Sequence, residues 1–178
     1  KRLSAKNELD DYSSMLKNSN QNLWNLHSIL ETIRYEIKIN YKSYDYGNGY
    51  YYQSMDKLNI TGYRDTEERI NQLGLREKLN GKSVLDIGSN TGFILLSLAE
   101  QITQGVGVEL NPYLVASGKE IATYLDFKNI ELLASSFEDY NSSGITFDAV
   151  LSLANHSTFD NNTKQSVDDY FQKIFNLL

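Results

Sequence analysis

The chain has no cysteine among its 178 residues, and no apolar run approaches the length of a membrane span. The first absence excludes a disulfide framework and a thiolate metal site, and we predict no metal centre. The second, together with an amino terminus that lacks the charged, apolar and small-residue pattern of a signal peptide, predicts a cytoplasmic protein. The chain does have 40% apolar residues, which at this length predicts one domain with a sizeable core.

Positive charge is also scarce. The formal net charge is −6, and residues 56–178 carry 10 basic and 17 acidic side chains, a net charge of −7. A region of that charge repels a phosphate backbone unless a local basic patch offsets it, and the sequence shows no such patch. The absence of a basic amphipathic helix likewise disfavours an acceptor embedded in a bilayer. By exclusion, the sequence favours a small-molecule partner, such as a sugar or another metabolite.

The most informative stretch is residues 83–99, which has the pattern of a strand, a tight turn and a helix. The strand is a short apolar run with β-branched residues, as expected for a parallel strand buried on both faces. Gly88 and Gly92 follow, and neither carries a Cβ that would keep the backbone from a ligand. The next helix points its free N–H groups and positive dipole end at the turn. This order predicts a nucleotide pocket.

A second predicted strand, residues 105–109, ends on a carboxylate. Glu109 lies about 20 residues past the glycine turn, where an acidic residue can accept hydrogen bonds from both ribose hydroxyls. Leu110 follows Glu109 and is predicted to contact the same cofactor. The turn and the acid in this order describe a mononucleotide-binding half of an α/β, doubly wound parallel sheet.

Two classes of cofactor use such a half-sheet. A dinucleotide site expects the pattern G-x-G-x-x-G, but the run from Gly88 is Gly-Ser-Asn-Thr-Gly, so Asn90 stands where the middle glycine belongs. Asn90 would crowd a pyrophosphate, which argues against a nucleotide-sugar or NAD-dependent oxidoreductase or epimerase. That enzyme class stays the alternative.

Residues 60–178 resemble the class I S-adenosylmethionine-dependent methyltransferases, a family of Rossmann-like domains in which an acidic residue precedes the glycine turn, as Asp86 precedes Gly88 here. The family commonly has glycine at the position of Asn90. The resemblance implies S-adenosyl-L-methionine as cofactor and methyl transfer to an O or N atom, and it leaves the acceptor open. A buried carboxylate at Asp86 needs a partner, which the cofactor or a backbone amide supplies.

The resemblance also implies which residues hold the cofactor. Those of the turn are Gly88, Ser89, Asn90 and Gly92. The loop after the third strand covers the adenine, and the family often has an aspartate at the position of Ser136. Adenine recognition here is therefore expected to use Ser136, a main-chain N–H near Phe137, or Glu138.

Tyr63 and Arg64 come just before a helix whose N-cap we expect at Asp65 or Thr66, with Asp65 and Glu68 in capping-box spacing. A capped surface helix does not explain Tyr63 and Arg64. In the family an element at this place closes over the methionine end of the cofactor, where a guanidinium can pair with the carboxylate. The same stretch is weakly similar to transfer-RNA wobble-uridine methyltransferases, so a tRNA-modifying enzyme is an alternative as to substrate.

Asn155 and His156 are the candidate catalytic residues, because they directly follow the fourth predicted strand, whose end faces the transferred methyl group in the family. A neutral imidazole can take a proton from an attacking hydroxyl or amine near pH 7. The alternative is that His156 is structural and that catalysis is by proximity alone.

The expected catalytic region spans residues 56–178. We place its strands near 83–87, 105–109, 130–133 and 147–151, and its helices near 67–79, 92–101, 113–124 and 166–177. A complete methyltransferase of this class has seven strands, so the fourth strand is left as an exposed edge. We therefore expect either a piece of a longer protein with further domains, or a partner over that edge.

Residues 1–55 form a helical and Tyr-rich extension. Five residues repeat at seven-residue spacing: Leu9, Leu16, Leu23, Leu30 and Ile37. We expect two amphipathic helices, near 6–17 and 22–38, packed on the domain or on a neighbour. The alternatives are the end of a coiled coil and, for the protein as a whole, a self-associating, non-catalytic assembly module. The tyrosines of 41–52 form either a lid or surface packing.

Overall fold

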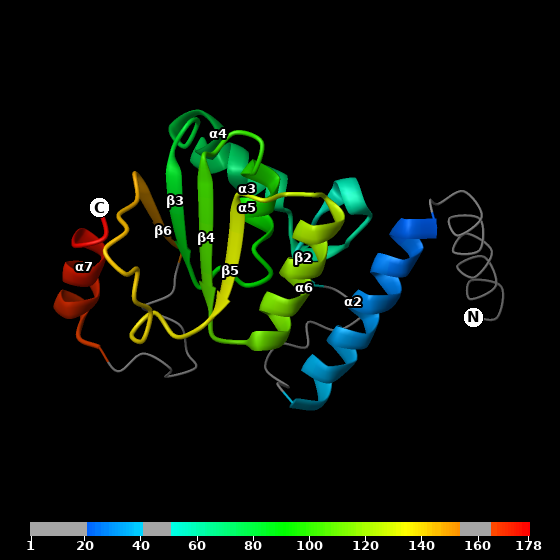
Figure 1. The fold of residues 1–178 in the computed structure, drawn as a ribbon. Coiled ribbons are helices and arrows are strands. Elements are labelled where there is room, and N and C mark those ends of the chain that lie inside the picture. Colours follow the sequence, from blue (N-terminus) through cyan, green and yellow to red (C-terminus); the bar gives the residue numbers. More distant parts are fainter. Residues whose placement is uncertain (1–20, 41–50, 154–164) are drawn as a thin grey trace.

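The computed structural model describes residues 21–40, 51–153 and 165–178. Its centre is a sheet of four parallel strands in the order β5-β4-β3-β6 (Figure 1). The strands are β3 (Ser83–Ile87), β4 (Gln104–Glu109), β5 (Ile130–Ala134) and β6 (Ala149–Ser152). The predicted α/β fold with a parallel sheet is confirmed, and each strand lies within two residues of its expected place.

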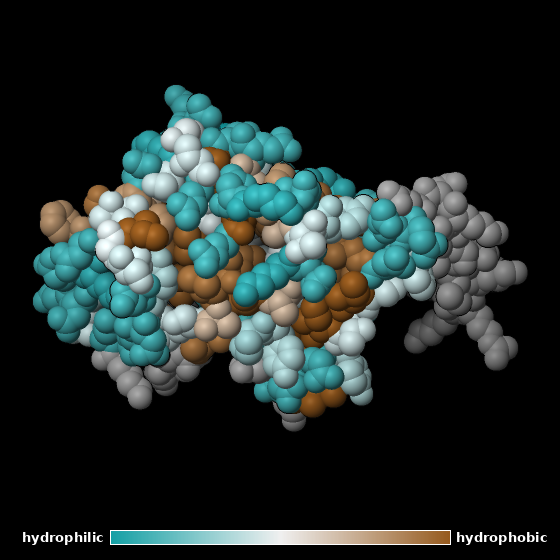
Figure 2. Space-filling model, viewed as in Figure 1, coloured by the Kyte–Doolittle hydropathy of each residue, from teal (hydrophilic) through white to brown (hydrophobic). Residues whose placement is uncertain are grey.

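The two faces of the sheet bury different sets of side chains, because successive residues of a strand point to opposite sides. On one face, Val84 packs with Leu95 and Ile70 in a cluster under the helices α3 (Thr66–Leu73), α4 (Leu75–Lys78), α5 (Phe93–Leu98) and α6 (Pro112–Tyr124). On the other, Leu85 packs with Tyr170 of α7 (Val167–Phe175). On this second face, apolar side chains reach the surface over the strands beside α7 (Figure 2). The sheet is thus the middle of three layers.

Side chains cap the amino-terminal ends of α3 and α6. The Asp65 carboxylate accepts a hydrogen bond from Glu68 N at 2.8 Å, which confirms the predicted N-cap of α3. The Asn111 amide oxygen accepts one from Tyr113 N at 3.0 Å and caps α6. The single helix expected over 67–79 is wrong. Gly74 adopts a left-handed conformation with φ 61°, and this ends α3 and starts α4.

The amino-terminal part adds a long helix, α2 (Gln21–Asn40), which lies beside α6 (Figure 1). Leu30 and Ile37, two of the five repeated positions, are buried, as is Leu26. Leu26 and Leu30 share a core cluster with Phe93 of α5 and Ile121 of α6. The prediction of a helix near 22–38 packed on the domain is confirmed. The helix expected near 6–17 lies outside the described residues.

A small two-stranded parallel sheet follows, which the sequence did not suggest. It pairs β1 (Tyr51–Gln53) with β2 (Gly62–Arg64) around the short 3-10 helix η2 (Asp56–Leu58). A Cβ on Gly62 would lie 2.1 Å from the backbone carbon of Gln53, so the two strands approach closely because Gly62 has no side chain. Tyr51 is buried with its ring 5.8 Å from that of Phe93, and of the Tyr-rich segment 41–52 only its last two residues are described.

At the other edge of the large sheet, β6 pairs only with β3 among the described residues. This agrees with the expectation that the fourth strand forms an edge. None of the helices that the structure describes is long and apolar enough to cross a membrane.

Candidate cofactor site

The predicted site residues meet at one edge of the sheet because the carboxyl ends of parallel strands lie side by side. The turn after β3 is tied to β4, since the backbone N–H groups of Gly88 and Ser89 both donate to Val108 O, at 2.8 and 3.1 Å. The loop after β5 is tied to the same strand, since Ser135 N donates to Glu109 O at 2.9 Å. Three strand ends therefore form one continuous rim.

The turn itself is built on left-handed backbone conformations. Gly88, Asn90 and Gly92 have φ values of 67°, 55° and 73°. Asparagine tolerates this region better than other residues with a side chain, because its short amide can bond locally. The Asn90 Oδ1 atom accepts a hydrogen bond from Thr91 N at 3.0 Å. Asparagine is thus compatible with the left-handed backbone conformation that the turn has at this position.

Glu109 connects the turn to the helix α6. Its side chain is 7% exposed, and its two oxygens accept from Asn90 N at 3.0 Å and from Asn111 N at 2.9 Å. Backbone donors hold a carboxylate in one orientation. The predicted ribose-binding acid is therefore preorganised at the tip of β4.

Asp86 is buried next to this cluster, with 3% of its surface exposed. Burial raises its pKa from 3.8 to about 7; the Arg69 guanidinium lowers that pKa and the Glu109 carboxylate raises it further. Arg69, on α3, was not singled out from the sequence. Its helical spacing could have found it, because it stands three residues after buried Thr66 and just before buried Ile70, at the inner border of α3.

Ser89 supplies a direct test of whether this site suits a ligand. The residue is 3% exposed, and its Oγ has no hydrogen-bond partner in the described part of the chain. The hydroxyl sits over Gly107, where an added Cβ would lie 2.7 Å from it, and Gly107 is the register partner of Asp86. A buried polar atom without a partner is costly. The rim, the acid and this hydroxyl fit a polar cofactor.

The other predicted cofactor contacts are placed as follows. Leu110 is 45% exposed at the end of β4. Ser136 caps the loop after β5, because its Oγ accepts from Asp139 N at 3.0 Å and donates to Asp139 Oδ2 at 2.7 Å. The Phe137 ring packs edge-on against Tyr170, with centroids 5.2 Å apart. Ser136 and Phe137 thus lie beside the rim, where Ser136 bonds to Asp139 and Phe137 packs against Tyr170.

Tyr63 and Arg64 lie on β2, in the small sheet. Tyr63 is 65% exposed, and the Arg64 guanidinium stacks over its ring at 5.6 Å. Their role at the methionine end of the cofactor stays a prediction. Asn155 and His156 lie outside the described residues, beyond the end of β6, and their catalytic roles also stay predictions.

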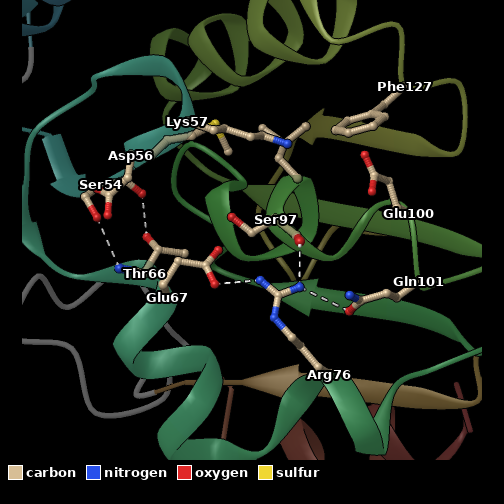
Figure 3. Close-up of a pocket in the computed structure, with 12 residues that line it drawn as sticks. Ser54, Asp56, Lys57, Thr66, Glu67, Arg76, Ser97, Glu100, Gln101 and Phe127 are labelled. Carbon is tan, nitrogen blue, oxygen red and sulfur yellow. Dashed lines mark hydrogen bonds and ion pairs between the residues drawn. The ribbon is translucent and has the colours of Figure 1, made fainter.

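A cavity of about 370 Å³ lies elsewhere, between η2, α3, α4 and α5 (Figure 3). Arg76 lies in its wall, where it bonds to Glu67 at 2.5 Å, to Gln101 at 3.2 Å and to the carbonyl of Ser97 at 3.3 Å. None of the residues predicted to bind the cofactor lines this cavity. Its arginine is engaged by Glu67 and Gln101, so we assign the cavity no part in the reaction.

Comparison with known proteins agrees with this geometry. A family model described as a methyltransferase domain matches residues 78–178, which is more than half of the chain. The chain therefore belongs to this family of methyltransferase domains. A search of curated proteins found no match.

A solved structure of similar fold covers most of this chain. The structure of WbdD with the kinase inhibitor LY294002 superposes with a TM-score of 0.59 at 18% identity, over 83% of this chain and 34% of the other. A methyltransferase from Thiobacillus denitrificans, in complex with S-adenosyl-L-homocysteine, has a TM-score of 0.49 at 21% identity, over 62% and 44% of the two chains. In the first three structures found, the match spans between 36% and 50% of the other chain.

Proposed function

We propose that this protein transfers the methyl group of S-adenosyl-L-methionine to an O or N atom of a small molecule, such as a sugar or another metabolite. The observation that carries the proposal is the Glu109 carboxylate, held by two backbone amides between the glycine turn and α6. An acid so placed accepts both hydroxyls of a ribose. The cytoplasmic location expected from the composition stays a prediction.

The residues of the rim contact different parts of the cofactor according to their charge. Glu109 orients the ribose, and the turn brings backbone close to the cofactor at Gly88 and Gly92. Asp86 offers a carboxylate to the cationic end of the cofactor, which supplies an electrophilic methyl group on a sulfonium. Arg69 offers a guanidinium near the same place. Fixed groups of this kind act by holding the acceptor and the methyl group in line at attack distance.

Binding of S-adenosyl-L-homocysteine tests the proposal directly. We expect calorimetry to show one site in the wild-type protein and a loss of about 1.5–3 kcal/mol of binding free energy in Glu109→Ala, since hydrogen bonds to a charged group are lost. Glu120→Ala, an exposed glutamate of α6, is the matched control and should bind as the wild type does. Absence of binding by the wild type, or equal binding by Glu109→Ala, would sink the proposal. A thermal shift with NAD in place of S-adenosyl-L-homocysteine would favour the oxidoreductase or epimerase.

His156 is proposed as the general base, which accepts the proton of the attacking hydroxyl or amine, with Asn155 orienting the acceptor. Once an acceptor is found, the turnover should rise with pH through about 6.5, the unperturbed pKa of histidine. His156→Ala should abolish that rise and lower turnover without changing the affinity for S-adenosyl-L-homocysteine. Full turnover in the variant would leave proximity alone as the mechanism.

A further inference from the structure

The side chain of Lys173, in α7, donates hydrogen bonds to the main chain of the loop that follows β5. Its Nζ atom donates to Phe137 O at 2.6 Å and to Glu138 O at 2.8 Å, and it lies 4.9 Å from the centre of the Phe137 ring. Burial lowers the pKa of the amine, while the nearby carboxylates of Asp139 and Glu138 raise it. Hydrogen bonds from a charged donor are stronger than neutral ones. One side chain therefore fixes two consecutive main-chain carbonyls and a ring.

The loop that Lys173 binds, residues 135–139, is part of the rim formed by the strand ends. It starts at Ser135, whose N–H bonds to the carbonyl of Glu109, and it is closed by the bonds between Ser136 and Asp139. Ligands of open parallel sheets bind just outside the carboxyl ends of the strands. A ligand held by the Glu109 side chain therefore has this loop as its neighbouring wall.

Two further contacts make α7 a fixed support for that wall. Glu138 Oε1 accepts from Gln165 N at 3.0 Å, just before the helix. Tyr170, one turn before Lys173, packs against Phe137 and bonds through its hydroxyl to Ser152 Oγ at 2.7 Å, at the end of β6. The position of the loop is thus set from a helix on the far side of the strand ends.

We propose that Lys173 is a positioning residue for the cofactor. It holds residues 136–139 in the shape that the nucleoside end of the cofactor packs against, and it acts through the loop without touching the cofactor. The inference rests on the proposed function. If Lys173 instead only fastened α7 to the fold, its loss would lower the stability and leave the affinity of the folded protein unchanged.

The test compares Lys173→Met, which keeps an apolar stem of similar length and removes the donors, with Lys173→Arg, which restores a charged donor. Lys128→Met is the control, because the Lys128 side chain is 80% exposed and its ion pair with Asp126 is a surface one. Calorimetry uses S-adenosyl-L-homocysteine and adenosine as two separate probes. We expect Lys173→Met to weaken both by about tenfold, a loss comparable to one charge-assisted hydrogen bond. Lys173→Arg should recover most of the affinity, and Lys128→Met should change nothing.

Hydrogen exchange gives a second measurement that needs no stable variant. In the wild-type protein, adenosine should slow the exchange of the amides of residues 137–139. The inference is overturned if adenosine leaves these amides unprotected, or if folded Lys173→Met binds both probes as tightly as the wild type does. Failure of the wild type to bind S-adenosyl-L-homocysteine overturns the proposed function and this inference together, whereas unchanged binding by the variant overturns the inference alone.

Discussion

Asn90 shows how a residue with a side chain can adopt the left-handed backbone conformation that usually favours glycine. The turn requires a left-handed conformation at this position, with φ 55°, and asparagine satisfies it through a local bond from Thr91 N to its own side-chain oxygen. The backbone N–H of Asn90 donates a hydrogen bond to the Glu109 carboxylate. The requirement at this position is therefore one of backbone shape, and glycine is only the commonest way to meet it.

The buried carboxyl of Asp86 makes the stability depend on pH. Because burial raises its pKa from 3.8 to about 7, the folded protein holds a proton between these values that the unfolded chain has lost. The free energy of unfolding should therefore fall as the pH rises from about 4 to 7, by up to about 1.4 kcal/mol per pH unit, and level off above 7. Urea unfolding at several pH values measures this.

The isosteric variant Asp86→Asn is the comparison for that prediction. The difference in stability between the variant and the wild type should grow in favour of the variant as the pH rises through the same range, since the amide does not titrate. Parallel curves for the two proteins would show that this carboxyl is not the titrating group.

At the scale of the element, the sequence predicted those helices and strands that are long enough to show a regular apolar spacing. The helix α2 and the strands β3, β4 and β5 lie where apolar spacing placed them. The sheet of β1 and β2 was missed because strands of three residues leave no period to read, and their parallel pairing depends on a close approach at Gly62. The break at Gly74 was missed because the residues on both sides favour helix.

The packing of α2 can be tested by truncating a residue at its centre. Leu30 is 2% exposed and lies in the cluster with Phe93 and Ile121. Leu30→Ala should lower the free energy of unfolding by about 3 kcal/mol, since it removes buried methyl groups and leaves a cavity. Ile29→Ala, at a neighbouring position that is 43% exposed, should change it by less than about 1 kcal/mol. Equal effects of the two substitutions in thermal unfolding would contradict the packing of α2.

At the scale of the whole molecule, the sequence predicted the fold class and most of the rim, because the order of strand, glycine turn and acid is local in the chain. It did not predict which charges converge from elsewhere. Arg69 faces Asp86 only because α3 packs over β3, and Lys173 reaches Phe137 only because α7 crosses the opposite face. Helical spacing can place Arg69 at the inner border of α3. Which residue each of these charges meets depends on the tertiary arrangement, which local sequence patterns do not encode.

The net charge leads to a prediction about partners at this same scale. With a net charge of −6, the protein should bind unfractionated transfer RNA with a dissociation constant weaker than about 100 μM at physiological salt, the weak limit of non-specific binding. Fluorescence anisotropy with labelled tRNA measures this, and lowering the salt concentration should not rescue binding. Binding in the micromolar range would revive the tRNA-modifying alternative.

The cluster that joins α2 to α5 and α6 also decides how the protein can be divided. Leu26, Leu30 and Tyr51 lie on one side of residue 55, and Phe93 and Ile121 lie on the other. A polypeptide that started at residue 56 would bare an apolar surface on two of the helices beside the rim. Surfaces of that kind promote aggregation. We therefore expect α2 to keep the protein soluble by covering this apolar surface. A shortened version of the chain should retain it.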